Sequence, residues 1–164
     1  MPTSLHDRAA TGTATGAAGP SPGRPSAGID PRGPQFTATI TAVVLVAILL
    51  TSYPIALTLT VIQVGLFAVG AVAGVQKTPQ AFLFRYLVRP RLRPPAELED
   101  PAPPRFAQAV GLVFTAVALV AFAVGATPVA QVAIGLALVA AVLNAVFRFC
   151  LGCELYLLIR RVTH

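Results

Sequence analysis

The chain has 164 residues, of which 55% are hydrophobic and only 11% charged, and its formal net charge is +6. A soluble domain carries roughly a quarter charged residues, so this composition leaves too few polar groups to cover a water-exposed surface. It excludes an ordinary cytosolic enzyme and indicates an integral membrane protein.

The first 28 residues are rich in Ala, Gly, Pro, Ser and Thr, and they contain no apolar core of the kind that a signal peptide needs. This composition predicts a disordered cytoplasmic tail that is not cleaved. The membrane domain is expected to cover residues 29–162.

Two apolar stretches without a charged side chain follow, over residues 36–75 and 106–147. A helix needs about 20 residues to cross the hydrocarbon core, so each stretch is long enough for two crossings. Pro54 and Pro128 suit the first turn of a returning helix, where the missing N–H is no loss. The expected fold is therefore all-α, with four transmembrane helices over 36–53, 55–76, 106–124 and 128–147.

The Lys and Arg residues, 12 in number, all lie outside these spans, and neither predicted hairpin turn carries a charge. By the positive-inside rule, both termini and the central segment are expected on the cytoplasmic side of the inner (cytoplasmic) membrane. The lipid bilayer thus accounts for the basic charge, and no nucleic-acid partner is expected. The basic residues are Arg8, Arg24, Arg32, Lys77, Arg85, Arg89, Arg91, Arg93, Arg105, Arg148, Arg160 and Arg161.

An internal repeat begins at Asp30-Pro31-x-x-Pro34-x-Phe36, which returns seventy positions later as Asp100-Pro101-x-x-Pro104-x-Phe106. It predicts a duplication, with repeat one over 30–92, repeat two over 100–162 and a proline-rich linker over 90–104. Each repeat contains an even number of crossings, so the two hairpins should have parallel orientation about a pseudo-twofold axis along the membrane normal. The two aspartates are expected to accept backbone N–H bonds at the helix starts.

An apolar stretch bordered by arginine follows each inward helix, over residues 79–89 and 149–161. Apolar residues recur at helical spacing in the first stretch, and Arg85 and Arg89 are placed to reach lipid headgroups. This pattern suggests short interfacial helices. The alternative, in which the inward helix continues past the membrane, stays open.

The two cysteines of the chain stand together as Cys150-Leu151-Gly152-Cys153. At the offset of seventy they correspond to Gln80 and Leu83, so repeat one lacks the thiols. Because the two repeats differ in chemistry here, this is the place to look for function.

Arg148 lies two residues before Cys150, and at the same offset it corresponds to Thr78. A nearby guanidinium and a helix N-terminus both favour thiolate over thiol, so Arg148 is expected to tune the thiolate. A reducing compartment would keep the pair as a dithiol unless a partner oxidises it.

Three interpretations of the cysteine pair remain open. Cys150 and Cys153 are candidate thiols that exchange disulfide or persulfide sulfur with a soluble partner. They are alternatively small residues that pack the membrane boundary, or half of a metal site completed in a dimer. Zinc requires four ligands and the only histidines, His6 and His164, lie at the termini, so we assign no metal or cofactor residue. Whether the protein is an enzyme is left open.

Several segments together resemble the bacterial membrane-protein family filed as domain of unknown function 4395, over about residues 29–162. They are Ile29-Asp30-Pro31-Arg32-Gly33-Pro34-x-Phe36, Leu87-x-Arg89-Pro90, Pro94-Pro95-x-Glu97-Leu98-Glu99-Asp100-Pro101-x-Pro103-Pro104-Arg105-Phe106-Ala107-Gln108 and Phe149-Cys150-Leu151-Gly152-Cys153-Glu154.

The resemblance implies a multi-pass membrane protein whose activity is not established. Members are often encoded near thioredoxin-like and rhodanese-like sulfurtransferase proteins, an association that favours a thiol-redox or sulfur-relay role. The alternative is a non-catalytic membrane scaffold or docking subunit for such a soluble partner. Whether the chain forms a homo-oligomer is left open.

Overall fold

The computed structural model describes residues 28–95 and 97–163, which form helices joined by turns and contain no β-strand. Four of the helices are long and apolar enough to cross a membrane. The predicted all-α membrane fold is therefore confirmed, whereas the predicted disordered tail lies outside the described residues except for residue 28. The four are α1 (Arg32–Leu50), α2 (Tyr53–Val72), α4 (Ala102–Ala123) and α5 (Thr127–Phe147).

All four helices begin earlier than predicted, α1 and α4 by four residues and α2 and α5 by only one or two. A carboxylate oxygen of Asp30 accepts the N–H of Arg32 at 3.0 Å, and one of Asp100 accepts the N–H of Ala102 at 2.9 Å. These bonds satisfy amide groups that a helix start leaves without a partner, so α1 and α4 begin directly after the Asp-Pro pairs. The two aspartates thus have the architectural role that was expected.

The turns of both hairpins lie where the prolines predicted them. Pro54 and Pro128 lie in the first turn of α2 and α5. The Tyr53 hydroxyl donates a hydrogen bond of 2.9 Å to the Phe122 carbonyl oxygen, and the two rings meet edge to face at 6.0 Å. This contact ties the start of α2 to the end of α4, close to the tips of the two hairpins.

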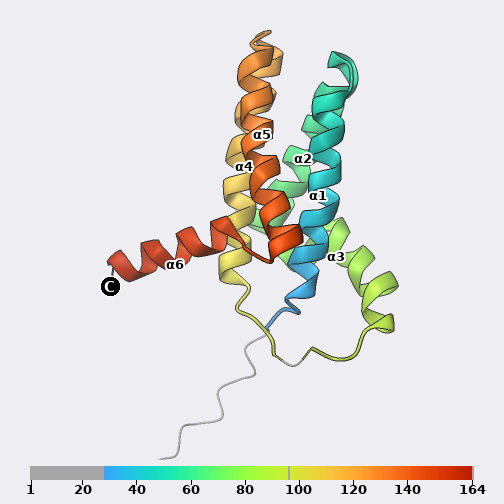
Figure 1. Ribbon diagram of the computed structural model, residues 1–164, viewed down its shortest axis with the longest axis vertical. Coiled ribbons are helices and arrows are strands. Elements are labelled where there is room, and N and C mark those ends of the chain that lie inside the picture. Colours follow the sequence, from blue (N-terminus) through green and yellow to red (C-terminus); the bar gives the residue numbers. More distant parts are fainter. Residues whose placement is uncertain (1–27, 96, 164) are drawn as a thin grey trace, which may run out of the picture.

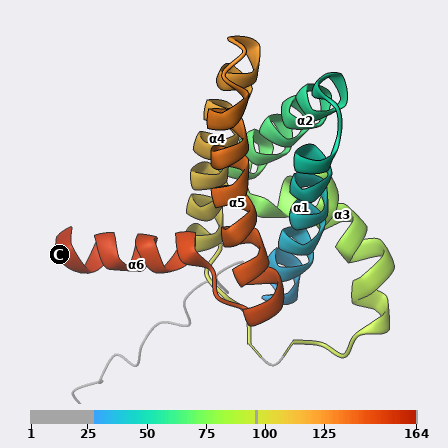
Figure 2. The same ribbon diagram turned by 45° about the horizontal axis from the view of Figure 1, so that its top comes forward.

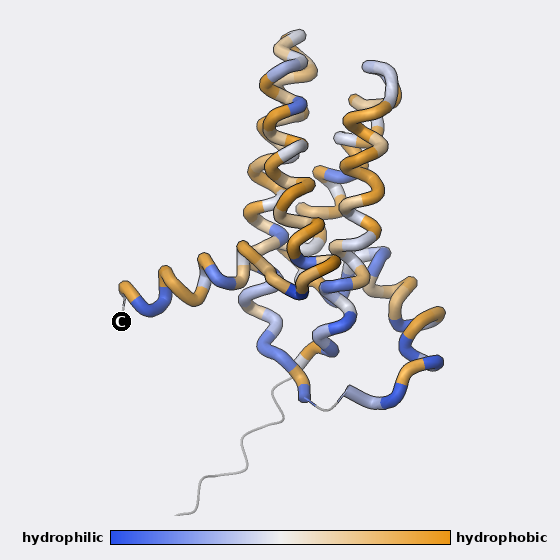
Figure 3. Tube along the Cα trace, viewed as in Figure 1, coloured by the Kyte–Doolittle hydropathy of each residue, from blue (hydrophilic) through white to orange (hydrophobic). Residues whose placement is uncertain are grey.

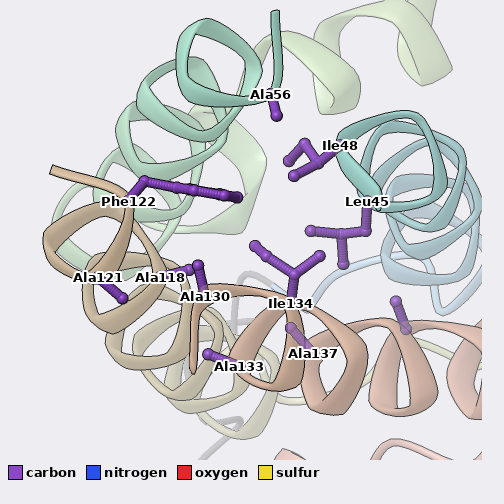
Figure 4. Close-up of a cluster of buried hydrophobic side chains, with 11 residues drawn as sticks. Leu45, Ile48, Ala56, Ala118, Ala121, Phe122, Ala130, Ala133, Ile134 and Ala137 are labelled. Atoms are coloured by element: carbon purple, nitrogen blue, oxygen red, sulfur yellow. The ribbon is translucent and has the colours of Figure 1, made fainter. Parts of the chain in front are cut away.

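The two hairpins lie side by side, and each helix packs mainly against a helix of the other hairpin (Figures 1 and 2). Helix α1 contacts α5, and α2 contacts α4. Leu45 and Ile48 from α1 meet Ile134 from α5 and Phe122 from α4 in the core (Figure 4). Small side chains complete this cluster and let the helix backbones approach closely: Ala56, Ala118, Ala121, Ala130, Ala133, Ala137 and Ala141.

Each hairpin also caps the inward helix of the other. The Arg105 guanidinium donates to the carbonyl oxygens of Ala71 and Val72, both at 2.7 Å, and the Gln35 amide donates to that of Ala145 at 3.0 Å. The donors are seventy positions apart, but the acceptors Ala71 and Ala145 are seventy-four apart. A twofold relation between the hairpins would produce these reciprocal hydrogen bonds. The duplication itself stays a prediction.

Short helices leave the bundle at the end opposite the hairpin tips (Figures 1 and 2). Helix α6 (Leu151–Thr163) begins beside α4 and points sideways out of the bundle (Figure 1). Helix α5 therefore does not simply continue, and that alternative is wrong for repeat two. The corresponding segment of repeat one is α3 (Pro79–Leu83), preceded by the 3-10 helix Val75–Lys77 and continued by a π-helical turn Phe84–Val88 and the 3-10 helix Arg89–Arg91.

The linker is held against the start of α1. Ile29 and Glu99 exchange two backbone hydrogen bonds of 2.9 and 3.0 Å, and the Arg32 guanidinium donates to the Arg93 carbonyl oxygen at 3.0 Å. Hydrophilic residues gather at this end of the molecule, whereas the four long helices are mostly hydrophobic (Figure 3). The described charged groups therefore share one end with α3, α6 and the linker.

We expect Arg105→Ala to lower the free energy of unfolding by about 1 to 3 kcal/mol, because two carbonyl groups at the end of α2 lose a charged donor. Titration of the purified protein with denaturing detergent measures this change. Arg161→Ala, an exposed arginine in the last turn of α6, is the control and should stay near wild type. Equal stability of the two variants would contradict the capping role.

Candidate functional site

The site begins where α5 ends. Arg148 adopts a left-handed backbone conformation with a φ of 57°, and the N–H groups of Arg148 and Phe149 both bond to the Leu143 carbonyl oxygen. In repeat one, Gly74 has the corresponding positive φ of 99° shortly after α2. The reversal at Arg148 ends α5 and turns the chain toward α6.

Cys150 stands directly before α6 and caps it. Its carbonyl oxygen accepts the N–H of Glu154 at 3.0 Å, and its sulfur accepts the N–H of Cys153 at 3.3 Å. This is the geometry in which a serine or threonine side chain caps a helix N-terminus. The sulfur of Cys150 therefore lies at the positive end of the α6 dipole.

Thr78 has the same role in repeat one, where its hydroxyl oxygen accepts the N–H of Ala81 at 3.3 Å at the start of α3. The correspondence of Cys150 and Cys153 with Gln80 and Leu83 is therefore wrong, and so is that of Arg148 with Thr78. The capping residues Thr78 and Cys150 are seventy-two positions apart, because the offset changes after the inward helices.

Aromatic contacts made by the helices that follow the two caps show the same offset of seventy-two. Phe36 of α1 packs on Phe84 with ring centroids 5.7 Å apart, and Phe106 of α4 packs on Tyr156 at 5.7 Å. Phe84 and Tyr156 are also seventy-two positions apart. Repeat one thus carries a hydroxyl and a methyl group, Thr78 and Ala81, where repeat two carries two sulfurs.

Cys150 and Cys153 form a disulfide, with their Cα atoms 5.2 Å apart. The expected dithiol is therefore not the form that the structure contains. Both cysteines are half-buried and Arg148 is exposed. The first turn of a helix brings residues three apart onto one face, which is why this spacing allows the bond to close.

Gly152 fixes the cysteine pair against α4. A Cβ atom at this position would lie 2.6 Å from the Cα atom of Ala107 and 2.7 Å from its Cβ atom. Only a residue without a side chain allows α6 to cross α4 so closely, and that crossing places the disulfide beside the first turns of α4. Sequence reasoning singled out the two cysteines and missed this glycine between them.

The disulfide lies on the wall of a cavity of about 860 Å³ between α1, α4, α5 and the linker. Arg148 lines the same cavity, so the structure brings together the three predicted site residues. The charged lining residues, Arg32, Glu97, Glu99 and Arg148, come from the start of α1, the linker and the end of α5. Deeper in the bundle the lining is neutral and mostly apolar. This deeper lining includes Ala38, Thr41, Phe67, Gln108, Val110, Gly111, Phe114, Leu136, Ala137, Val139, Ala140, Ala141 and Asn144.

The metal interpretation concerns a half-site that a second copy of the chain would complete. Residues 28–95 and 97–163 contain no cluster of three or more His, Cys, Asp or Glu side chains that could hold a metal ion. The sulfurs of Cys150 and Cys153 are bonded to each other and offer no thiolate in this form. His6 and His164 lie outside the described residues.

We expect Gly152→Ala to destabilise the protein by about 1 to 3 kcal/mol, since the added methyl group collides with the α4 backbone rather than with a movable side chain. Gly135→Ala is the matched control, because a Cβ atom there meets nothing within 4 Å. Detergent-induced unfolding measures the stability of both variants. Faster hydrogen exchange in the α6 amides should accompany the loss, and unchanged exchange in Gly152→Ala would contradict the contact.

Comparison with models of protein families gives a match. The family model described as Domain of unknown function (DUF4395) matches residues 29–161, which is more than half of the chain. The matched region covers both hairpins, the linker and the disulfide. Neither the curated proteins nor the solved structures include a match to this chain. The chain belongs to the family described as Domain of unknown function (DUF4395).

Proposed function

We propose that this membrane protein exchanges disulfide bonds with a soluble thiol partner through Cys150 and Cys153. The observation that carries the proposal is the disulfide at the start of α6, closed within one helical turn on a cavity wall. A bond that served only to staple the fold would join segments far apart in the chain, because stabilisation increases with the loop that is closed. This bond spans three positions, which favours a reactive role.

The exchange proceeds in two displacement steps. A thiolate of the partner attacks the Cys150 sulfur, the bond to Cys153 breaks, and Cys153 leaves as a thiolate that takes up a proton. The second thiolate of the partner then attacks the partner sulfur that is bonded to Cys150. A disulfide forms within the partner, and Cys150 is released as a thiolate that takes up a proton. The partner leaves as a disulfide, and two electrons and two protons remain on the cysteine pair.

The surroundings of Cys150 suit it to this role. When Cys150 is released as a thiolate, the N–H of Cys153 and the positive end of the α6 dipole stabilise its charge. Arg148 lines the same cavity and adds a positive charge. A partner that carries a persulfide would instead give its outer sulfur to the Cys150 thiolate and leave as a thiol, which is the sulfur-relay form of the proposal.

We also propose the orientation in the membrane. The Lys and Arg residues lie before, between and after the two hairpins and are missing from the hairpin turns. By the positive-inside rule, the end with α3, α6 and the linker faces the cytoplasm of a bacterial inner membrane, together with both termini. A soluble partner would then be a cytoplasmic thioredoxin-like or rhodanese-like protein.

A docking subunit without chemistry of its own is the second candidate. Arg89, Arg91 and Arg93 are exposed at the same end as the linker, where a soluble protein with an acidic surface would meet them. This candidate predicts that removing both sulfurs preserves the phenotype, whereas neutralising these three arginines abolishes it. Thiol exchange predicts a null phenotype when both sulfurs are removed.

We expect Cys153→Ser to accumulate a covalent complex with a thioredoxin whose second, resolving cysteine is replaced by serine and whose remaining cysteine carries a thionitrobenzoate leaving group. The Cys150 thiolate attacks the thioredoxin sulfur and expels thionitrobenzoate, and neither protein keeps a second cysteine that could resolve the product. Non-reducing electrophoresis of the purified proteins should show a complex that dithiothreitol cleaves. This complex should be at least tenfold more abundant with Cys153→Ser than with Cys150→Ser.

The control combines Cys150→Thr with Cys153→Ala, which installs the residues of Thr78 and Ala81 and keeps a side-chain cap for α6. It should fold like the wild type and give no complex. Equal amounts of complex for Cys153→Ser and Cys150→Ser, or none for either, would reject the exchange role of Cys150.

The orientation is tested in the same cysteine-free background. Ser52→Cys, in the first hairpin turn, should react with a membrane-impermeant maleimide on intact cells. Thr163→Cys, at the end of α6, should react at least tenfold faster after permeabilisation, because the basic residues keep that end inside. Both positions are exposed. The opposite labelling pattern would overturn the orientation.

A further inference from the structure

We propose that the cavity binds a membrane-soluble quinone, which takes two electrons from the reduced Cys150–Cys153 pair and restores the disulfide. The inference rests on the proposed exchange, after which the cysteines are a dithiol. A dithiol becomes a disulfide only when a second molecule accepts two electrons. Three properties of the cavity indicate the class of acceptor: how deep it extends, whether lipid can reach it, and which residues line it.

The cavity reaches far into the bundle from the disulfide. Along α5 its lining runs from Arg148, near the sulfurs, to Leu136, and at 1.5 Å of rise per helical residue this is about 18 Å. The hydrocarbon core of a bilayer is about 30 Å thick, so the cavity extends beyond the headgroup region into the apolar core. A water-soluble thiol partner would need only the charged end.

The deep wall of the cavity also contributes to the outer face of the bundle. Leu136 is 53% exposed and Val139 57% exposed, although both line the cavity. They lie on α5, one of the helices suited to cross the membrane, so this face meets lipid chains. A molecule dissolved in the bilayer can therefore enter from the side and approach the sulfurs without passing the charged end.

The lining matches a neutral ring with polar oxygens and an apolar tail. Phe67 and Phe114 supply aromatic surface, and Gln108 and Asn144 supply amide N–H groups for carbonyl oxygens. The charged lining residues come from the end near the disulfide and the linker, so no ionisable group has to be neutralised deeper in the cavity. A volume of about 860 Å³ is within the usual range of ligand cavities.

Repeat one provides an internal comparison. The cavity beside α3 measures about 290 Å³, and its lining contains Ala81 where repeat two has Cys153, together with the charged residues Arg85 and Arg89. Pro34, Thr37 and Gln108 line both cavities, but of these two only the larger one reaches the sulfurs. A reaction between thiols and an apolar ligand requires that the sulfurs lie beside a cavity large enough for that ligand.

The quinone alone is sufficient to oxidise the dithiol. The Cys150 thiolate adds to a ring carbon of the quinone and forms a carbon–sulfur bond. The Cys153 thiolate then attacks the Cys150 sulfur, the carbon–sulfur bond breaks, and its electron pair stays on the ring. The ring takes up the two protons that the thiols released, so a dithiol and a quinone become a disulfide and a quinol.

The test uses the full chain in lipid nanodiscs, reduced and then mixed with decylubiquinone. We expect one quinol per disulfide formed, with a rate that saturates as the quinone concentration rises. Ala140→Phe, which adds a ring to the cavity wall, should slow this reaction at least tenfold. Val142→Phe adds the same ring two positions along α5, outside the lining, and should react like the wild type.

Non-specific addition of thiols to quinone would be equally fast in both variants, and that result would overturn the inference. A photoreactive azidoquinone gives a second measurement that does not depend on the Phe variants. Its adducts should lie within residues 107–114 or 136–144, or at the lining residues Ala38, Thr41 and Phe67, and adducts confined to other parts of the chain would also overturn the inference.

Equilibration of the wild type in glutathione redox buffers separates the two proposals. A pair that interconverts between disulfide and dithiol with glutathione but does not reduce the quinone overturns the quinone site and leaves the exchange role intact. A pair that glutathione does not interconvert at any ratio rejects the exchange role itself. The cysteine-free variant sets the background in both assays.

Discussion

The carbonyl groups at the ends of α2 and α5 determine how the two hairpins hold together. A helix end leaves carbonyl groups without an intrahelical partner, and a donor from a neighbouring helix can supply one. Arg105 and Gln35 supply the missing donors, and each reaches from the first helix of one hairpin to the last turns of the other. The inward helices therefore end beside the starts of α1 and α4, and the charged residues of the cavity lining lie at this end of the bundle.

The position of the disulfide follows from this arrangement. Since α5 ends beside α1 and reverses at Arg148, the chain must cross the base of the bundle, and Gly152 lets it do so in contact with Ala107. The N–H of Cys153 in the first turn of α6 bonds to the Cys150 sulfur, and both cysteines line the cavity. The turn that ends α5 thus also places two sulfurs on the cavity wall, and the sulfur of Cys150 accepts a backbone N–H there.

The four long helices could be predicted because apolar stretches and turn prolines are local signals. Pro54 and Pro128 marked the hairpin turns, and the Asp-Pro pairs marked the helix starts more accurately than hydropathy did. The cavity could not be predicted, since its volume depends on distances between helices that no local pattern contains. A constant offset of seventy pairs Cys150 with Gln80, whereas the capping hydrogen bonds pair it with Thr78, because the segments between matched residues differ in length.

The comparison of Thr78 with Cys150 narrows what the sulfurs are for. A threonine side chain already caps α3, so capping alone does not require sulfur, and packing at Ala81 does not require a side chain larger than a methyl group. Repeat one builds the same turn with ordinary residues, and the cavity that Ala81 lines measures about 290 Å³. Beside the Cys150 cap, by contrast, two sulfurs line a cavity of about 860 Å³. A purely structural account explains either one alone, whereas a reaction between the sulfurs and an occupant of the cavity explains why they occur together.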